Sequence, residues 1–146
     1  MRTDAPNQAA EWVCLNPNQA EEQRIQGFLE QELRLAASFQ ALSGRYGRQT
    51  RTLRSMAADN LHSARELLSA YFIMTGVKLT PEPAIPLALS KAYEAALRRL
   101  YDELGILVQH YGARETEDVC LQEIYRRAGE QLLCQQRLLR SLIAQL

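Results

Sequence analysis

Four long stretches of apolar residues at three- and four-residue spacing, separated by glycines and prolines, constrain this chain more than any other feature of its sequence. The spacing is that of one face of an α-helix, which turns once every ~3.6 residues. No stretch alternates apolar and polar residues in the way that a half-buried strand does. The sequence therefore predicts an all-α domain with four helices.

Capping residues, glycines and prolines predict where each helix begins and ends. The predicted helices run from Asn16-Pro17 to Gly44, from the turn after Gly47 to Thr75, from Pro86 to Tyr111, and from Thr116 onward. We expect Gly76 to stop the second helix and Gly112 to give the third a left-handed cap. Residues 1–15 lack helical periodicity, so we predict an N-terminal tail over 1–15 and one domain over 16–146.

The composition excludes several classes of partner. Seventeen basic residues balance seventeen acidic ones, so nothing in the charge indicates nucleic acid or an anionic membrane surface as a partner. No stretch approaches the ~20 apolar residues of a membrane span. The three cysteines form no CxxC pair, which predicts neither a disulfide framework nor a zinc site and favours a reducing cytoplasm.

Each predicted inward stripe contains a polar interruption. The first and third helices carry one glutamate each, Glu32 and Glu94, in otherwise mainly apolar stripes. The second and fourth helices carry a small polar pair at positions i and i+3. These pairs are Asn60 with Ser63, and Gln131 with Cys134. The first and third helices therefore resemble each other, as do the second and fourth.

One inward glutamate on helices one and three, with Glu-x-x-His on helices two and four, is the plan of ferritin-like di-iron proteins. This sequence resembles that plan over residues 20–145, and in particular its rubrerythrin-like branch. The best match is the run ADNLHSARELL at 58–68, which continues to Tyr71 and Thr75-Gly76. The resemblance implies a ferritin-like four-helix bundle with a crossover connection between the second and third helices.

The length of the connection after Gly76 is compatible with that topology. Ten residues in extended or polyproline form span ~31–36 Å, enough to return along the bundle if the segment is nearly straight. The alternative topology is a simple up-down-up-down bundle.

The resemblance places the family's metal ligands at Glu32, Asn60, Ser63, Glu94, Gln131 and Cys134. Only the two glutamates keep the family's ligand type, and two carboxylates are too few to hold a pair of iron ions. The substitutes nearest in sequence are Glu130, if Gly129 distorts the fourth helix, and His62. The His62 side chain is expected to face outward, about 200° round its helix from Asn60.

We therefore expect a non-catalytic structural or interaction module without a cofactor. The first alternative is a metal-dependent oxidoreductase that binds iron or manganese through Glu32, Glu94 and a substitute such as Glu130, Cys134 or His62. The second alternative is a small-molecule binding bundle. If Glu32 and Glu94 face each other, at least one should have a raised pKa, with Asn60 and Gln131 as hydrogen-bond partners.

Apolar residues beside the main stripes leave two interpretations open. They indicate either a homodimer contact or a wider internal core. These residues are Leu100, Ile106, Leu107, Leu132 and Leu139. Within the stripes, we expect Leu67, Leu97 and Leu138 to be buried.

Overall fold

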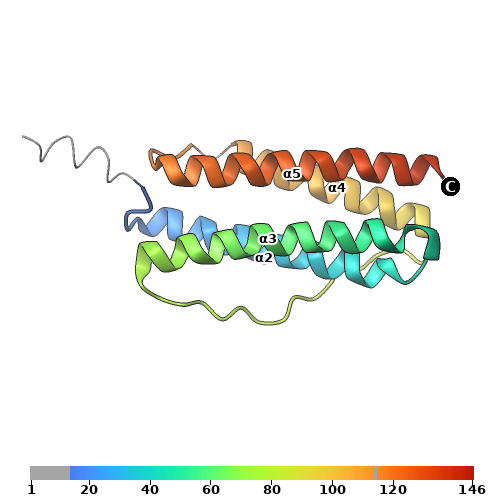
Figure 1. Cartoon of the computed structure of the whole chain (residues 1–146), viewed down its shortest axis with the longest axis horizontal. Helices are drawn as coiled ribbons and strands as arrows, with labels where there is room; N and C mark the ends of the chain where they lie inside the picture. The colour runs from blue at the N-terminus through green and yellow to red at the C-terminus, as the bar shows by residue number, and fades with distance from the viewer. Residues whose placement is uncertain (1–13, 114) are drawn as a thin grey trace, which may run out of the picture.

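The computed structural model describes residues 14–113 and 115–146, which form an all-helical bundle without a strand. Its elements are α2 (Gln19–Ser43), the short 3-10 helix η1 (Gly47–Gln49), α3 (Thr50–Thr75), α4 (Tyr93–Gly112) and α5 (Val119–Ala144). The four long helices lie side by side along the long axis (Figure 1). The all-α prediction is confirmed. Most of the predicted tail, residues 1–13, lies outside the described residues.

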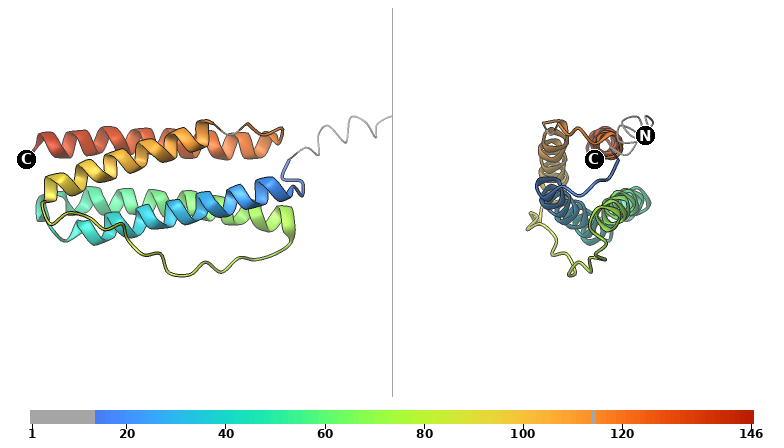
Figure 2. Two further views of the ribbon diagram at one scale, coloured as in Figure 1. Left: turned by 180° about the vertical axis from the view of Figure 1, so that it is seen from behind. Right: turned by 90° about the vertical axis from the view of Figure 1, so that its left-hand side faces the viewer.

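Two hairpins make up the bundle. The backbones of α2 and α3 approach each other most extensively, and α4 pairs with α5 in the same way. The segment 77–92 between the hairpins contains no helix and returns along the outside of the bundle (Figures 1 and 2). The backbone N–H of Leu87 in this segment donates to Oγ of Ser38 on α2, at 2.9 Å. Helices α3 and α4 consequently run in the same direction.

Local hydrogen bonds set the helix ends. Asn18, rather than Asn16, caps α2, because its side chain accepts from the N–H of Glu21 at 3.1 Å. Gly76 ends α3 with a φ of 74°, as predicted. Asp118, rather than Thr116, caps α5 and accepts from the N–H groups of Cys120 and Leu121. A side-chain oxygen at the N-termini of α2 and α5 thus takes up N–H groups that have no partner within the helix.

The predicted start of α4 at Pro86 is wrong by seven residues. Arg45 explains part of the difference, because its guanidinium donates to the carbonyl oxygens of Ser90 and Lys91. The side chain of Ser90 also accepts from the N–H of Ala92, a local bond that competes with the helix. At the other end of α4, Gly112 is helical and takes no left-handed φ, so that predicted cap is wrong too.

The predicted inward stripes of α2 and α3 are confirmed, whereas those of α4 and α5 are rotated. The first two helices bury Ile25, Phe28, Glu32, Leu35, Phe39 and Leu42, and Leu53, Ala57, Asn60, Ala64 and Leu67. Helix α4 instead buries Ala96, Leu97, Leu100, Leu104, Leu107 and Tyr111, and α5 buries Leu121, Tyr125, Ala128, Leu132, Gln135, Leu139 and Leu142. The observed stripe of α4 contains no charged residue, so it removes more apolar area from water than the one through Glu94.

This rotation places four of the five apolar residues beside the stripes in a wider internal core. Leu100, Leu107, Leu132 and Leu139 are buried within the chain, as a wider internal core requires, and Ile106 alone of the five is 47% exposed. The prediction that Leu138 is buried is wrong, since it is 44% exposed. No helix among the described residues combines the length and hydrophobicity needed to cross a bilayer.

Candidate functional site

A buried carboxylate lies at the centre of the bundle. Glu32, near the middle of α2, has no exposed surface. Its Oε1 accepts a hydrogen bond from Nδ2 of Asn60 on α3, at 2.9 Å. Its Oε2 accepts from the hydroxyl of Tyr111 on α4, at 2.7 Å. Each carboxylate oxygen therefore has a neutral donor from a different helix.

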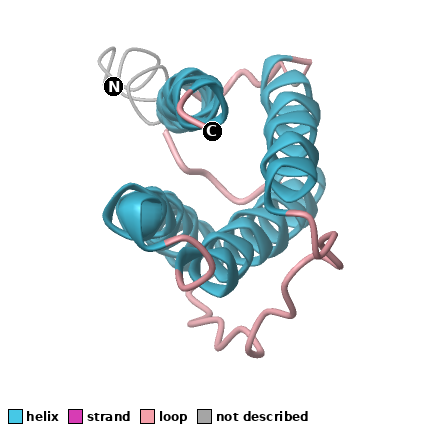
Figure 3. Ribbon diagram, turned by 90° about the vertical axis from the view of Figure 1, so that its right-hand side faces the viewer, coloured by secondary structure: helices cyan, strands magenta, loops and turns pink. Residues whose placement is uncertain are grey.

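The fourth helix joins the site through Gln135. Its Nε2 donates to Oδ1 of Asn60 at 3.2 Å and to the carbonyl oxygen of Met56 at 3.0 Å. The network of Glu32, Asn60, Tyr111 and Gln135 thus connects all four helices, which surround a common axis (Figure 3). Among the described residues, no buried side-chain nitrogen or oxygen lacks a hydrogen-bond partner. The buried polar side chains of this interior are therefore satisfied by hydrogen bonds within the protein.

Burial controls the charge of this site. Loss of hydration raises the pKa of Glu32 to about 7, and the hydrogen bonds from Asn60 and Tyr111 only partly offset that rise. The sequence predicted a raised pKa from burial and from repulsion by Glu94; burial raises the pKa of Glu32, whereas Glu94 is exposed and takes no part. Burial and the nearby Glu32 carboxylate also raise the pKa of Tyr111 well above its ordinary value. Tyr111 is therefore a neutral donor at physiological pH.

An aromatic cluster covers one end of the site. The ring of Tyr111 stacks on Phe28, with ring centroids 4.2 Å apart, and Tyr125 meets Phe28 edge-on at 5.1 Å. The hydroxyl of Tyr125 donates to Glu21, which is buried and pairs with Arg24 at 3.3 Å. Tyr125 and Glu21 thus form a second buried tyrosine–glutamate pair, with Arg24 beside its carboxylate.

The structure separates the six positions that the resemblance had grouped. Glu32 and Asn60 meet directly, and Oγ of Ser63 donates to Gln131 at 2.8 Å as a separate pair. The expectation that Glu94 points inward is wrong, because Glu94 is exposed and pairs with Arg98 at 3.0 Å. Cys134 is also exposed, so its predicted inward position is wrong.

The substitute ligands also lie outside the interior. Glu130 is exposed and pairs with Arg126 at 2.8 Å, so no distortion at Gly129 turns it inward. His62 is exposed, as predicted from its angle to Asn60. With Glu94 and Glu130 at the surface, Glu32 is the one carboxylate of the predicted set in the central site.

Sequence reasoning placed Tyr111 and Gln135 on inward stripes but gave neither a role in the site. The signal that could have assigned them a role was the polar group that each brings into an inward stripe, the hydroxyl of Tyr111 in α4 and the amide of Gln135 in α5. A buried tyrosine hydroxyl or glutamine amide requires a partner, and the nearest buried acceptors lie on the facing helices.

These residues do not fit a di-iron centre. Such a centre needs several carboxylates and imidazoles, whereas Glu32 is joined here by two amides and a phenol. Among residues 14–113 and 115–146, one group of three or more His, Cys, Asp or Glu side chains is close enough to share an ion. That group consists of Cys14, Asp118 and Cys120, and it lies where the segment before α2 meets the start of α5.

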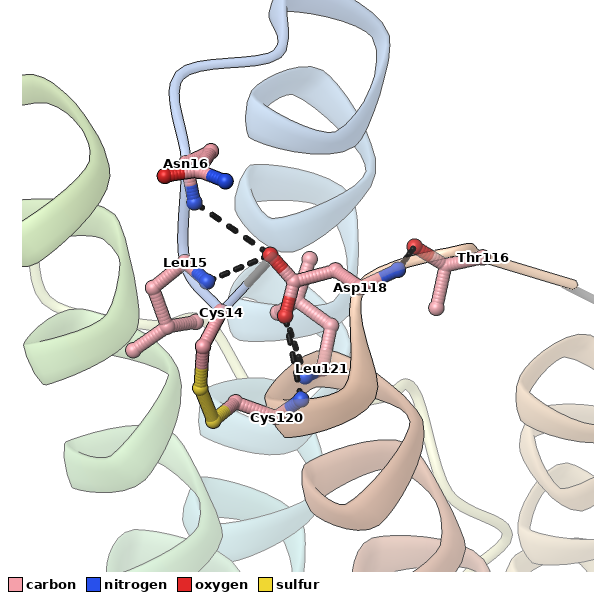
Figure 4. The surroundings of a disulfide bond; sticks show 7 residues. All are labelled: Cys14, Leu15, Asn16, Thr116, Asp118, Cys120 and Leu121. Atoms are coloured by element: carbon pink, nitrogen blue, oxygen red, sulfur yellow. Dashed lines mark hydrogen bonds between the residues drawn. A yellow bond between two sulfur atoms is a disulfide. The ribbon is translucent and has the colours of Figure 1, made fainter. Parts of the chain in front are cut away.

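In this second cluster the sulfur atoms are already bonded to each other. Cys14 and Cys120 form a disulfide, with Cα atoms 5.1 Å apart, and Figure 4 shows Asp118 beside it. Both carboxylate oxygens of Asp118 accept backbone N–H groups. The inference from cysteine spacing that the chain has no disulfide is therefore wrong, because residues 106 apart in sequence become neighbours only in the fold.

No protein family model, curated protein or solved structure matches this chain.

Proposed function

We propose that this chain is a ferritin-like bundle of the rubrerythrin-like type, in which hydrogen bonds replace the metal centre, and that it is a non-catalytic structural or interaction module. The observation that carries the proposal is that Asn60 and Tyr111 donate hydrogen bonds to both carboxylate oxygens of Glu32. In the family that the sequence resembles, carboxylates and imidazoles at this level hold metal ions. Here neutral donors bind both oxygens of the Glu32 carboxylate.

The path of the chain supports the ferritin-like part of the proposal. Helices α3 and α4 run in the same direction, and the segment between them returns along the bundle (Figure 2). The crossover connection implied by the resemblance has this direction. The pairing of Glu32 on the first helix with Asn60 on the second is also consistent with the plan.

Surface side chains support the interaction part. Phe72, Ile73 and Val77, at or just beyond the end of α3, are all more than half exposed, and so is Val119 at the start of α5. The end of α3 and the start of α5 lie at the same end of the bundle (Figure 1). Exposed apolar side chains at one end are typical of a contact surface.

We propose the cytoplasm as the location, although the disulfide is of a kind that persists best in oxidising compartments.

Metal analysis tests the proposal. Protein purified without chelators should contain iron, manganese and zinc at far less than one atom per chain. After aerobic addition of ferrous ion, it should show no absorption from an oxo-bridged di-iron centre. The matched control is Glu32→Gln, which should give the same result. Two metal ions per wild-type chain, lost in Glu32→Gln, would favour the metal-dependent oxidoreductase instead.

A further inference from the structure

The segment that leads into α2 is fastened to the start of α5 by a covalent bond and by a carboxylate. The disulfide joins Cys14 to Cys120, in the first turn of α5. Next to it, Oδ2 of Asp118 accepts from the backbone N–H groups of Leu15 and Asn16, while Oδ1 accepts from those of Cys120 and Leu121 at 3.0 Å (Figure 4). One side chain thus caps a helix and holds the neighbouring segment.

Leu15 is the third attachment. Its φ of 60° lies in the left-handed region, which a leucine adopts only where its surroundings hold it. The residue packs against the hydrophobic core and lines a groove of about 360 Å³ between α3 and α5, together with Ala70, Ile73 and Ile124. Leu15 forms part of the wall of this groove because the disulfide and Asp118 fix the backbone beside it.

We propose that residues 14–18, here called the latch, form a redox-controlled wall of the groove between α3 and α5. Both cysteines are only partly buried, so a dithiol reductant can reach the bond. A thiolate of the reductant attacks one sulfur, the other leaves as a thiolate, and a mixed disulfide forms. The second thiol of the reductant then closes its own disulfide. The two electrons of the dithiol thus reduce the protein disulfide to two thiols, and the reductant leaves oxidised.

Opening of the latch is a local event. Once the covalent bond is broken, the segment keeps non-covalent attachments, among them the backbone hydrogen bonds to Asp118 and the packing of Leu15, and the left-handed Leu15 can relax. Asp118 still caps α5 through Cys120 and Leu121, and the network around Glu32 does not involve the latch. Reduction therefore releases Leu15 and widens the groove without unfolding the bundle. The proposal does not depend on the metal-free function inferred above.

Thiol labelling combined with amide hydrogen exchange on the full chain tests the latch. Before reduction, N-ethylmaleimide should label Cys134 alone; after treatment with dithiothreitol it should label all three cysteines. Reduction should accelerate exchange at the Leu15 and Asn16 amides by at least about tenfold, leave residues 53–67 protected over the same minutes of exchange, and be reversed by reoxidation. Cys134→Ser should behave like the wild type. In Cys14→Ser/Cys120→Ser, exchange in the latch should be fast with or without dithiothreitol.

Three results would overturn the latch. The first is labelling of all three cysteines before reduction, because the bond would then be absent. The second is unchanged exchange at Leu15 and Asn16 after reduction, because the bond would then have no control over the segment. The third is loss of protection throughout α3 and α5 over the same minutes of exchange, which would be global unfolding rather than local opening. The reduced wild type supplies the same readout if the double variant does not fold.

Discussion

The hydroxyl of Tyr111 lies 2.7 Å from Oε2 of Glu32, so the end of α4 and the middle of α2 share a buried hydrogen bond. Asn60 binds the other carboxylate oxygen, and Gln135 binds Asn60. All four helices therefore meet around one carboxyl group. This arrangement makes the protonation of Glu32 the property that best reports on the state of the interior.

Stability should fall as pH rises through the neutral range. Glu32 has a folded pKa of about 7 and an ordinary value of 4.5, so between these values the folded protein retains a proton that the unfolded chain has released. The contribution is fully present below pH 4.5 and lost by about pH 8. It amounts to about 3 kcal/mol in the free energy of unfolding. Urea unfolding of the wild type from pH 5 to pH 8 measures it.

Two variants separate Glu32 from other titrating groups in that experiment. Glu32→Gln mimics the protonated side chain, so it should remove this fall and be at least as stable as the wild type at pH 8. Glu94→Gln changes an exposed ion pair, so it should cost less than about 1 kcal/mol and keep the fall. A wild-type fall that persists undiminished in Glu32→Gln would assign it to another group.

Tyr111→Phe should destabilise the protein in a pH-dependent way. The phenyl ring keeps the stacking on Phe28, but a carboxylate oxygen of Glu32 loses its donor. We expect a cost of about 1–3 kcal/mol, larger at pH 8 than at pH 5 because an ionised carboxylate accepts the stronger hydrogen bond. A double-mutant cycle with Glu32→Gln measures the coupling. Equal costs at both pH values would contradict the assigned hydrogen bond.

Neighbouring leucines test the rotation of α5. Leu139 is fully buried, whereas Leu138 is 44% exposed. Leu139→Ala should cost about 2–5 kcal/mol, and Leu138→Ala less than about 1 kcal/mol. Leu67→Ala and Leu97→Ala, also at fully buried positions, should match Leu139→Ala in chemical denaturation. A larger cost for Leu138→Ala than for Leu139→Ala would favour the inward stripe that was predicted from the sequence.

The disulfide should contribute to global stability as well as to the latch. It closes a loop between residues 106 apart, and the loss of chain entropy in the unfolded state corresponds to about 4–5 kcal/mol for a loop of that size. Guanidinium unfolding of the oxidised and reduced wild type measures the difference, with Cys134→Ser as the control. An oxidised protein no more stable than the reduced one would show that the bond strains the folded state.

The sequence was sufficient to predict the first hairpin but not the orientation of the second. The stripes of α2 and α3 each have one clear apolar face, so Glu32 and Asn60 were correctly placed inside. In α4 and α5, leucines lie on more than one face, and the 3–4 spacing alone fits two rotations of each helix. Packing against the first hairpin selects the rotation that places Glu94 and Cys134 outside.

Two features depended on contacts that are distant in sequence. The disulfide joins residues separated by almost the whole bundle, and cysteine spacing carries no information about such a pair. The start of α4 depends on Arg45, whose guanidinium binds carbonyl groups 45 and 46 residues later. A prediction from local helix propensity starts the helix at Pro86, because propensity takes no account of such tertiary hydrogen bonds.

The carboxyl ¹³C resonance of Glu32, followed by NMR as a function of pH in glutamate-labelled protein, tests the metal-free network most directly. Comparison with Glu32→Gln assigns the signal. The structure predicts that Glu32 titrates near pH 7, far above the ordinary value of 4.5, and that added Zn²⁺ leaves the midpoint unchanged. A Glu32 that stays ionised down to about pH 5, or becomes so when Zn²⁺ is added, would contradict the network and identify Glu32 as a metal ligand.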